Sequence, residues 1–436
     1  MSIGVLFILF LVMLAISLPV AATLGIAAFL PNFVAFFRTG DTTTLMTQLA
    51  VLVRNLANGV DAFTLLAIPM FILAGGIMAK GGISNKLFNI FAYFLANKTA
   101  GMPSAVILST LFYSMTSGSG PATVAAVGTM AIPLLVKLGY DIKWSTALIA
   151  VTGGIGVVSP PSIPYVLFGA ATGTNVGELF IAGIIPSVLI IILLLLYTYI
   201  YCKKHGEDKE KLLAYHAEVR ENGFWAVFKS SFWAMLAPVI ILGSIYTGVA
   251  APTEAAVIAV VYSLFLSVVV YRTLNLNELK DVFVSAINTY ATLLFILAAA
   301  VAFGRTLILM RAPQQIAEMI MGTFTTYIAI IIVINLFMLF IGTFLDTTPA
   351  ILILAPLFLP IAVAMGMHPV HFGVMMVINK AIGFVTPPLG VNIFVSSSIT
   401  GLPMMTIIKH SMVPVITFII ALFLIAFVPW FSLALI

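Results

Sequence analysis

The fold of this chain is decided by residues 152–162, TGGIGVVSPPS, which interrupt an otherwise apolar segment that runs from 143 to 172. Proline lacks a backbone N–H donor and keeps the residue before it out of the helical conformation, so the Pro-Pro pair unwinds the helix there. Unwound backbone is stable inside a lipid bilayer only where it lines a cavity or binds a ligand. In a membrane protein, this stretch therefore predicts a broken helix at a binding site.

The composition places the chain in a membrane. Of its 436 residues, 62% are hydrophobic and 8% are charged, whereas soluble domains are about half apolar and about a quarter charged. The long segments are apolar on all faces, as lipid requires. Much of the net charge of +5 lies in short loops, where Lys and Arg set topology, so it does not indicate a nucleic-acid partner.

A second copy of the interruption occurs at residues 383–392, GFVTPPLGVN, and shows that the chain contains an internal repeat. At a constant offset of 227 residues the following pairs match: Pro133 and Pro360, Gly139 and Gly366, Gly156 and Gly383, and Ser159-Pro160-Pro161 and Thr386-Pro387-Pro388. Each half of the chain is therefore expected to form the same set of helices.

Apolar runs predict an all-α polytopic membrane protein with two repeats, each with five crossings and one re-entrant helical hairpin. The predicted crossings are 3–18, 21–37, 62–79, 143–172 and 178–201, then 232–247, 252–271, 287–304, 370–400 and 411–433. The predicted hairpins are 103–137 and 326–365, with polar tips at 114–123 and 342–349. The arm Pro103–Met115 spans roughly 20 Å and falls short of the ~30 Å hydrocarbon core, so we expect each hairpin to enter and leave on one side.

The distribution of basic residues predicts the orientation. With both termini outside, most of the 19 Lys and Arg residues fall in the cytoplasm, as the positive-inside rule requires. The exceptions are Arg38, Arg54, Arg305 and Arg311 outside, and Lys380 within the membrane. Because five crossings per half is an odd number, the second repeat is inverted relative to the first. Inverted repeats with broken helices are typical of secondary transporters.

The same pattern divides the chain into domains. We predict a first repeat at 1–202, a charged cytoplasmic linker at 203–223 and a second, inverted repeat at 224–436. Scaffold helices are assigned to 1–98 and 224–323, and hairpins with broken helices, which form the transport domain, to 99–175 and 324–402. Interfacial helices are predicted near 45–60, 83–98, 274–286 and 313–323.

The tips and breaks carry the chemistry. Carbonyl groups freed at the end of a half-helix suit a cation such as Na⁺, and N–H groups at half-helix N-termini suit a carboxylate. Serine and threonine hydroxyls add neutral oxygen ligands. The alternative is that these residues only cap helices and permit close helix packing.

Two charged residues stand out in this apolar setting. Asp346 is the only acid deep in an apolar run, so it is either functional or the N-cap of the helix that follows. Lys380 precedes the second break and is expected either to balance a substrate carboxylate or to pair with Asp346.

The tip S-G-S-G-P-A-T, the run G-G-I-G-V-V-S-P-P-S-I-P and the second T-P-P-L-G-V-N resemble the large membrane (M) subunit of tripartite ATP-independent periplasmic (TRAP) transporters, over essentially the whole chain. The resemblance implies Na⁺-coupled uptake of a small organic acid by an elevator motion in the lipid bilayer of a bacterial inner membrane, with both termini periplasmic. It also implies two partners, a small four-helix membrane subunit (Q type) and a soluble periplasmic binding protein (P type), separate from this unfused subunit. The stretch G-V-V-S-P-P-S-I-P is more similar to sialic-acid members than to C4-dicarboxylate members.

The resemblance also implies the site residues. The first Na⁺ site is carried over to Ser114, Ser117, Ser119, Gly154, Val157 and Pro160. The second Na⁺ site is carried over to Asp346, Thr347, Gly383, Thr386 and Pro388. The substrate is expected between the tips, at Thr123, Ser159, Asn392 and Lys380.

Other functions remain as alternatives. The chain has no ATP-binding Walker motif, so ion coupling is the expected energy source. An ion-coupled organic-anion transporter working without a binding protein, and a channel, use similar polar tips. An intramembrane protease is disfavoured, since Thr116 stands where a G-x-S-G motif needs glycine and Asp346 is the single deep aspartate. We therefore expect no enzyme activity.

Overall fold

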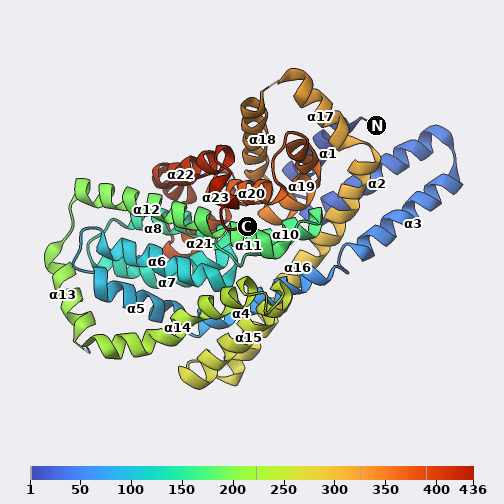
Figure 1. Cartoon of the computed structure of the whole chain (residues 1–436). Helices are drawn as coiled ribbons and strands as arrows, with labels where there is room; N and C mark the ends of the chain where they lie inside the picture. Colours follow the sequence, from blue (N-terminus) through green and yellow to red (C-terminus); the bar gives the residue numbers. More distant parts are fainter. Residues whose placement is uncertain (1, 222, 325, 389) are drawn as a thin grey trace.

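The computed structural model describes residues 2–221, 223–324, 326–388 and 390–436. The chain is 83% helical, and these residues form no β-strand. Within them, nine helices are long and apolar enough to cross a membrane, or ten if one bent pair counts as one span. The prediction of an all-α, multi-pass membrane protein is confirmed (Figure 1). Asn222 of the linker and Leu389 of the second break lie outside the described residues.

The helices follow the predicted order. The first half contains α1 (Ile3–Ala15), α2 (Val20–Thr39), α3 (Thr42–Asn58), the 3-10 turn η1 (Phe63–Leu66), α4 (Ala67–Lys80), α5 (Ile83–Leu95), α6 (Gly101–Ser117), α7 (Gly120–Lys137), α8 (Ile142–Thr152), α9 (Ile155–Val158), α10 (Ile163–Thr172), α11 (Val176–Ala182) and α12 (Ile184–His205). The linker contains α13 (Lys209–Arg220). The second half contains α14 (Gly223–Tyr246), α15 (Pro252–Leu264) with a π-helical extension η2 (Phe265–Val270), α16 (Leu276–Leu309), α17 (Ala312–Thr323), α18 (Tyr327–Gly342), α19 (Thr347–Ala364), α20 (Pro369–Gly383), α21 (Val391–Thr400), α22 (Met404–Phe427) and α23 (Trp430–Leu433).

The internal repeat is visible in the helices and in their packing. Adding 227 to the bounds of α7 yields the bounds of α19, and the other helices of the hairpins and breaks agree within a few residues. The halves also exchange partners: α10 packs on α19 as α21 packs on α7, and α4 packs on α15 as α16 packs on α2. Each half therefore completes the core of the other, and neither buries its hairpin alone.

The first hairpin, α6 and α7, begins and ends at the same place. The backbone N–H of Ala100, before α6, donates to both carboxylate oxygens of Glu207 at 2.9 and 3.1 Å. The Tyr140 hydroxyl, after α7, donates to the same carboxylate at 2.5 Å. Burial raises the pKa of the Tyr140 phenol, and the Glu207 carboxylate raises it further, so the phenol remains a donor. The two ends of the hairpin therefore lie together beside the linker, and its re-entrant insertion stays a prediction, since α7 is long and apolar enough to cross a membrane.

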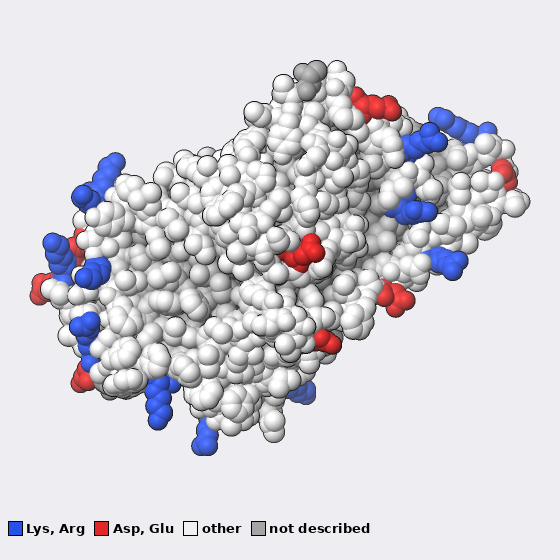
Figure 2. Space-filling model, in the orientation of Figure 1, with Lys and Arg blue, Asp and Glu red and all other residues white. Residues whose placement is uncertain are grey.

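Trp144 and His371 occupy equivalent positions in the two repeats, in the helices that precede the breaks. They contact the ends of different helices. Trp144, near the start of α8, donates from Nε1 to the Tyr197 hydroxyl of α12 at 3.1 Å. His371, 227 residues later at the start of α20, hydrogen-bonds Ser432 of α23 at 2.5 Å. The end of α12 is basic, whereas α22, which leads to α23, carries its lysine near its beginning. By the positive-inside rule, α8 and α20 therefore start on opposite sides of the membrane. Figure 2 shows Lys and Arg gathered toward opposite ends of the molecule.

The second half departs from the prediction at α16. The prediction of a separate interfacial helix at 274–286 is wrong, because α16 is one continuous helix of 34 residues, roughly 51 Å long. In the first half the chain breaks at Gly59 and Val60, between α3 and η1. In the second half α16 contains no proline, and no glycine before Gly304, so the helix is not interrupted there.

Replacing Glu207 by alanine is expected to loosen the base of the first hairpin. The substitution removes the acceptor for Ala100 N–H and for Tyr140, and hydrogen bonds to a charged group contribute about 1.5–3 kcal/mol each. A lower unfolding temperature in detergent, measured by intrinsic fluorescence, checks this. The exposed Glu210 of α13 is the matched control, and equal unfolding temperatures for the two variants would contradict the role of Glu207.

Candidate functional site

The first tip and the first break are in direct contact. Gly118, at the tip, adopts a left-handed conformation with φ of 59°, and its carbonyl accepts a hydrogen bond from the N–H of Ile163 at 3.2 Å. A Cβ atom at Gly156 would lie 2.6 Å from Thr123 Oγ1 and 2.7 Å from the Ser119 carbonyl oxygen. Glycine at 156 thus lets the oxygen atoms of the tip approach the unwound backbone.

Three of the predicted residues meet at this tip. Ser117 Oγ and Thr123 Oγ1 lie 2.9 Å apart, and Thr123 Oγ1 donates to the Ser119 carbonyl at 2.7 Å. Ser114 lies one turn earlier, and its hydroxyl donates to the Leu111 carbonyl of its own helix at 2.7 Å. A hydroxyl that donates its proton keeps lone pairs for a cation.

The break supplies further oxygen atoms. Ser162 Oγ donates to the Val157 carbonyl at 2.6 Å, and the Pro160-Pro161 peptide bond is cis. Ser159 is fully buried, and its Oγ has no hydrogen-bond partner among the residues described. The α-carbon of Gly154, in contrast, faces the ring of Phe418 on α22, where an added Cβ would lie 3.0 Å away.

The second half contributes a side chain to the first tip. Asn392, in the first turn of α21, donates from Nδ2 to the Ala150 carbonyl of α8 at 3.0 Å. Its Oδ1 atom is buried and finds no partner in the part of the chain that the structure describes. Cβ atoms added at Gly120 and Gly153 would lie 3.2 and 3.0 Å from this amide. Helix capping does not account for the buried oxygen atoms of Ser159 and Asn392, which have no hydrogen-bond partner among the described residues.

The second tip encloses a cavity of about 10 Å³, at the lower limit of what holds one water. The residues that line it are Gly342, Leu345, Asp346, Thr347, Lys380, Gly383, Phe384, Gly390 and Val391. Three predicted ligands, Asp346, Thr347 and Gly383, are thus brought together. Thr386 and Pro388 are not among the described lining residues. Thr386 Oγ1, in the break, donates to the Ile382 carbonyl near the end of α20 at 2.7 Å, and Pro388 is exposed.

The two charged residues of this tip do not pair. Asp346 occupies the N-cap position of α19, but its side chain makes no capping hydrogen bond. Lys380 is 2% exposed, and its ammonium group donates to the Met338 carbonyl of α18. Across the described ranges, no carboxylate lies within ion-pair distance of Lys380. The predicted Lys380–Asp346 pair is therefore not seen.

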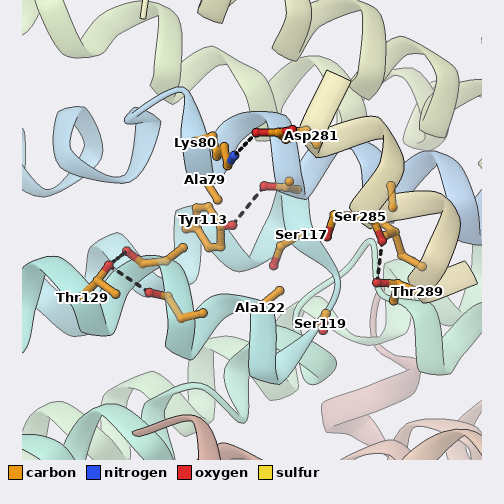
Figure 3. A pocket seen from close by; sticks show the side chains of 17 residues that line it. Ala79, Lys80, Tyr113, Ser117, Ser119, Ala122, Thr129, Asp281, Ser285 and Thr289 are labelled. Carbon is orange, nitrogen blue, oxygen red and sulfur yellow. Dashed lines mark hydrogen bonds and ion pairs between the residues drawn. The ribbon is translucent and has the colours of Figure 1, made fainter. Parts of the chain in front are cut away.

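A larger cavity, of about 690 Å³, is lined by the first hairpin, α4 and α16 (Figure 3). Ser117 and Ser119 lie at its hairpin side, and Lys80 forms an exposed ion pair of 3.6 Å with Asp281 across it. Sequence reasoning missed its α16 wall, where Thr289 Oγ1 donates to the Ser285 carbonyl at 2.9 Å. The available signal was the spacing of these two polar residues, one turn apart on an apolar helix.

This arrangement of repeats, tips and breaks matches one known family. The model of the tripartite ATP-independent periplasmic transporter, DctM component, matches residues 7–431. The chain belongs to this family. The resemblance of its motifs to TRAP large membrane subunits is confirmed.

Relatives of this TRAP large permease are named for different substrates. The isethionate TRAP transporter permease protein DctMQ of Oleidesulfovibrio alaskensis is 39% identical over 424 residues, 97% of this chain, which spans 64% of that protein. The C4-dicarboxylate large permease DctM of Pseudomonas aeruginosa is 37% identical over 375 residues, 86% of each chain. The sialic acid large permease SiaM of Vibrio cholerae is 34% identical over 382 residues, 88% of each chain. These values do not separate the substrates, and the similarity to sialic-acid members stays a prediction.

The fold of the TRAP permease also resembles that of a solved transporter. The YdaH transporter of Alcanivorax borkumensis superimposes with a TM-score of 0.59 over 90% of each chain. Only 13% of the aligned residues are identical, so the likeness concerns the fold alone.

Proposed function

We propose that this chain is the large membrane subunit of a Na⁺-coupled TRAP transporter that imports a small organic acid. The observation that carries the proposal is the first tip, where the oxygen atoms of Ser117, Ser119 and Thr123 meet the break beside the free oxygen atoms of Ser159 and Asn392. Such neutral oxygen atoms at unwound backbone suit Na⁺. The adjoining cavity of about 690 Å³ has room for a small organic acid next to Ser117 and Ser119.

Na⁺ coupling also suits an anionic solute. The membrane potential contributes about 2.3 kcal/mol per charge per 100 mV, so an anion entering the cell must overcome it. Two or more Na⁺ ions carried with it reverse the sign for a mono-anion. We assign one Na⁺ to the first tip and one to the second, at Asp346, Thr347 and Gly383. Relatives named for isethionate, C4-dicarboxylates and sialic acid support an organic acid as the solute.

The remaining parts of the proposal follow from the family. The subunit sits in a bacterial inner membrane with both termini periplasmic, beside a small four-helix membrane subunit, and receives its solute from a periplasmic binding protein. The hairpins and broken helices move as an elevator against the scaffold helices, which include α4 and α16. The alternative is an ion-coupled organic-anion transporter that needs no binding protein.

Reconstitution in liposomes tests this function. The chain is incorporated with the small subunit, and uptake of labelled C4-dicarboxylate, sialic acid and isethionate is followed with the matching binding protein. Accumulation is expected only with an inward Na⁺ gradient and the binding protein. Equal uptake with K⁺ in place of Na⁺ would reject the coupling, and equal uptake without the binding protein would favour the alternative.

Ser119→Ala and Asp346→Asn are each expected to raise the Na⁺ concentration for half-maximal uptake by about tenfold. Losing one ligand of a bound ion costs about 1.4 kcal/mol, which is a factor of ten in affinity. Ser398→Ala is the matched control, because Ser398 is exposed on α21 and bonds only its own helix. Wild-type Na⁺ dependence in both site variants would reject this assignment of ligands.

A further inference from the structure

The two tips differ in charge at corresponding positions. At the offset of 227 residues, Lys380 takes the place of Gly153, and Ile341 takes the place of Ser114. Asp346 takes the place of Ser119. The first tip is therefore built from neutral groups, whereas the second contains one lysine and one aspartate, which make no ion pair with each other.

In each half, a side chain donates a hydrogen bond to a carbonyl group near the end of the first hairpin helix, but the donor comes from a different position. In the first half the Ser114 hydroxyl donates to the Leu111 carbonyl near the end of α6. The equivalent carbonyl, Met338 near the end of α18, accepts instead from the Lys380 ammonium, because Ile341 has no hydroxyl. A positive charge thus stands at the C-terminal end of a half-helix, where the helix dipole favours a cation.

The position of the ammonium group excludes direct contact with a large solute. Lys380 lines the cavity of about 10 Å³, which has no room for an organic acid, and does not line the cavity of about 690 Å³. Gly342 makes the approach possible, since an added Cβ there would lie 3.3 Å from Nζ. Asp346, Thr347 and Gly383 line the same small cavity, so the ammonium stands where the second Na⁺ is expected.

We infer that Lys380 is a tethered cation that competes with Na⁺ for the second tip. This inference rests on the proposed function. Two positive charges in so small a space repel each other, and Asp346 is the one carboxylate among the residues that line it. Na⁺ therefore binds the second tip only after the ammonium withdraws, which the long and flexible lysine side chain permits. The first tip, with glycine at 153, binds Na⁺ without this competition.

Na⁺ titrations of the full-length protein in detergent, without solute, test the competition. Na⁺ binding is measured by calorimetry and by the rise in unfolding temperature. Lys380→Gln is expected to lower the Na⁺ concentration that half-saturates the second tip by at least about tenfold. Lys380→Arg keeps the charge and is expected to stay close to wild type. An unchanged or higher half-saturating concentration in Lys380→Gln overturns the inference; if solute binding alone weakens, Lys380 instead serves the solute.

The wild-type protein supplies a second test that does not depend on a folded Lys380 variant. Its two Na⁺ binding steps are expected to differ by at least about tenfold in concentration, with Ser119→Ala shifting only the tighter step. Two steps of equal affinity would refute the tethered cation and leave Na⁺ coupling intact. Absence of any Na⁺ binding would refute the proposed function itself.

Discussion

Gly156→Ala is expected to reduce Na⁺-driven uptake by at least about 100-fold. The new Cβ would lie 2.6 Å from Thr123 Oγ1 and 2.7 Å from the Ser119 carbonyl oxygen, so the first tip must move away from the break. Overpacking of this kind costs typically about 1–3 kcal/mol of stability, but the loss of function is larger, because a site must hold its geometry within about 0.5 Å. The measurement is the initial rate of uptake in liposomes, with membrane insertion checked by the yield of folded protein.

Other glycines provide the comparison for this variant. Gly243→Ala on α14 is the control, because no atom lies within 4 Å of the added Cβ and uptake should stay at the wild-type level. Gly383→Ala, at the equivalent position of the second half, places its Cβ 2.9 Å from the Gly342 carbonyl oxygen and is expected to impair the second tip. Normal uptake by Gly156→Ala would show that the contact of tip and break is not part of the site.

Asn392→Leu is expected to lower the rate of uptake at low solute concentration by at least about 30-fold. Leucine is similar in size, but it removes the bond to the Ala150 carbonyl and the free Oδ1 that faces the first tip. The buried Ala150 carbonyl, left without this hydrogen bond, costs about 1–3 kcal/mol of stability. The solute also loses one polar contact. The kinetics of uptake separate these effects, since loss of a solute contact raises KM and leaves the Na⁺ half-saturation unchanged.

Asn335 is the matched control for Asn392. It is also a buried asparagine, on α18, and its Nδ2 donates to the Ile331 carbonyl at 2.9 Å, away from the first tip. Asn335→Leu is expected to lower the unfolding temperature without raising KM. If Asn392→Leu behaves in the same way, Asn392 holds α21 against α8 and does not bind the solute.

Several features were predictable because they depend on local properties of the chain. The Pro-Pro pairs predicted the breaks at 152–162 and 383–392, since proline disrupts a helix wherever it stands. Hydropathy located the hairpins, and the polar tips predicted their turns. The continuity of α16 was missed, because charged residues near 278–281 suggested an interfacial helix, although the helix contains no proline, and no glycine before Gly304.

The partners of the polar side chains were not predictable in the same way. Lys380 was expected to bind a carboxylate, yet it caps the Met338 carbonyl, because the bend of the second tip brings the end of α18 to α20. The α16 wall of the large cavity was missed for a similar reason. Ser285 and Thr289 become site residues only because α16 packs against α4 beside the first hairpin.

The sequence by itself determined the membrane class, the repeat, its breaks and the position of the tips, because hydrophobicity and the backbone limits of proline and glycine act within a few residues. Only the tertiary structure decided that Asn392 serves the tip of the other half, across 242 positions of the chain. Such a contact arises from the exchange of helices between two repeats that each bury the other's hairpin, and this geometry is a property of packing that no local pattern encodes.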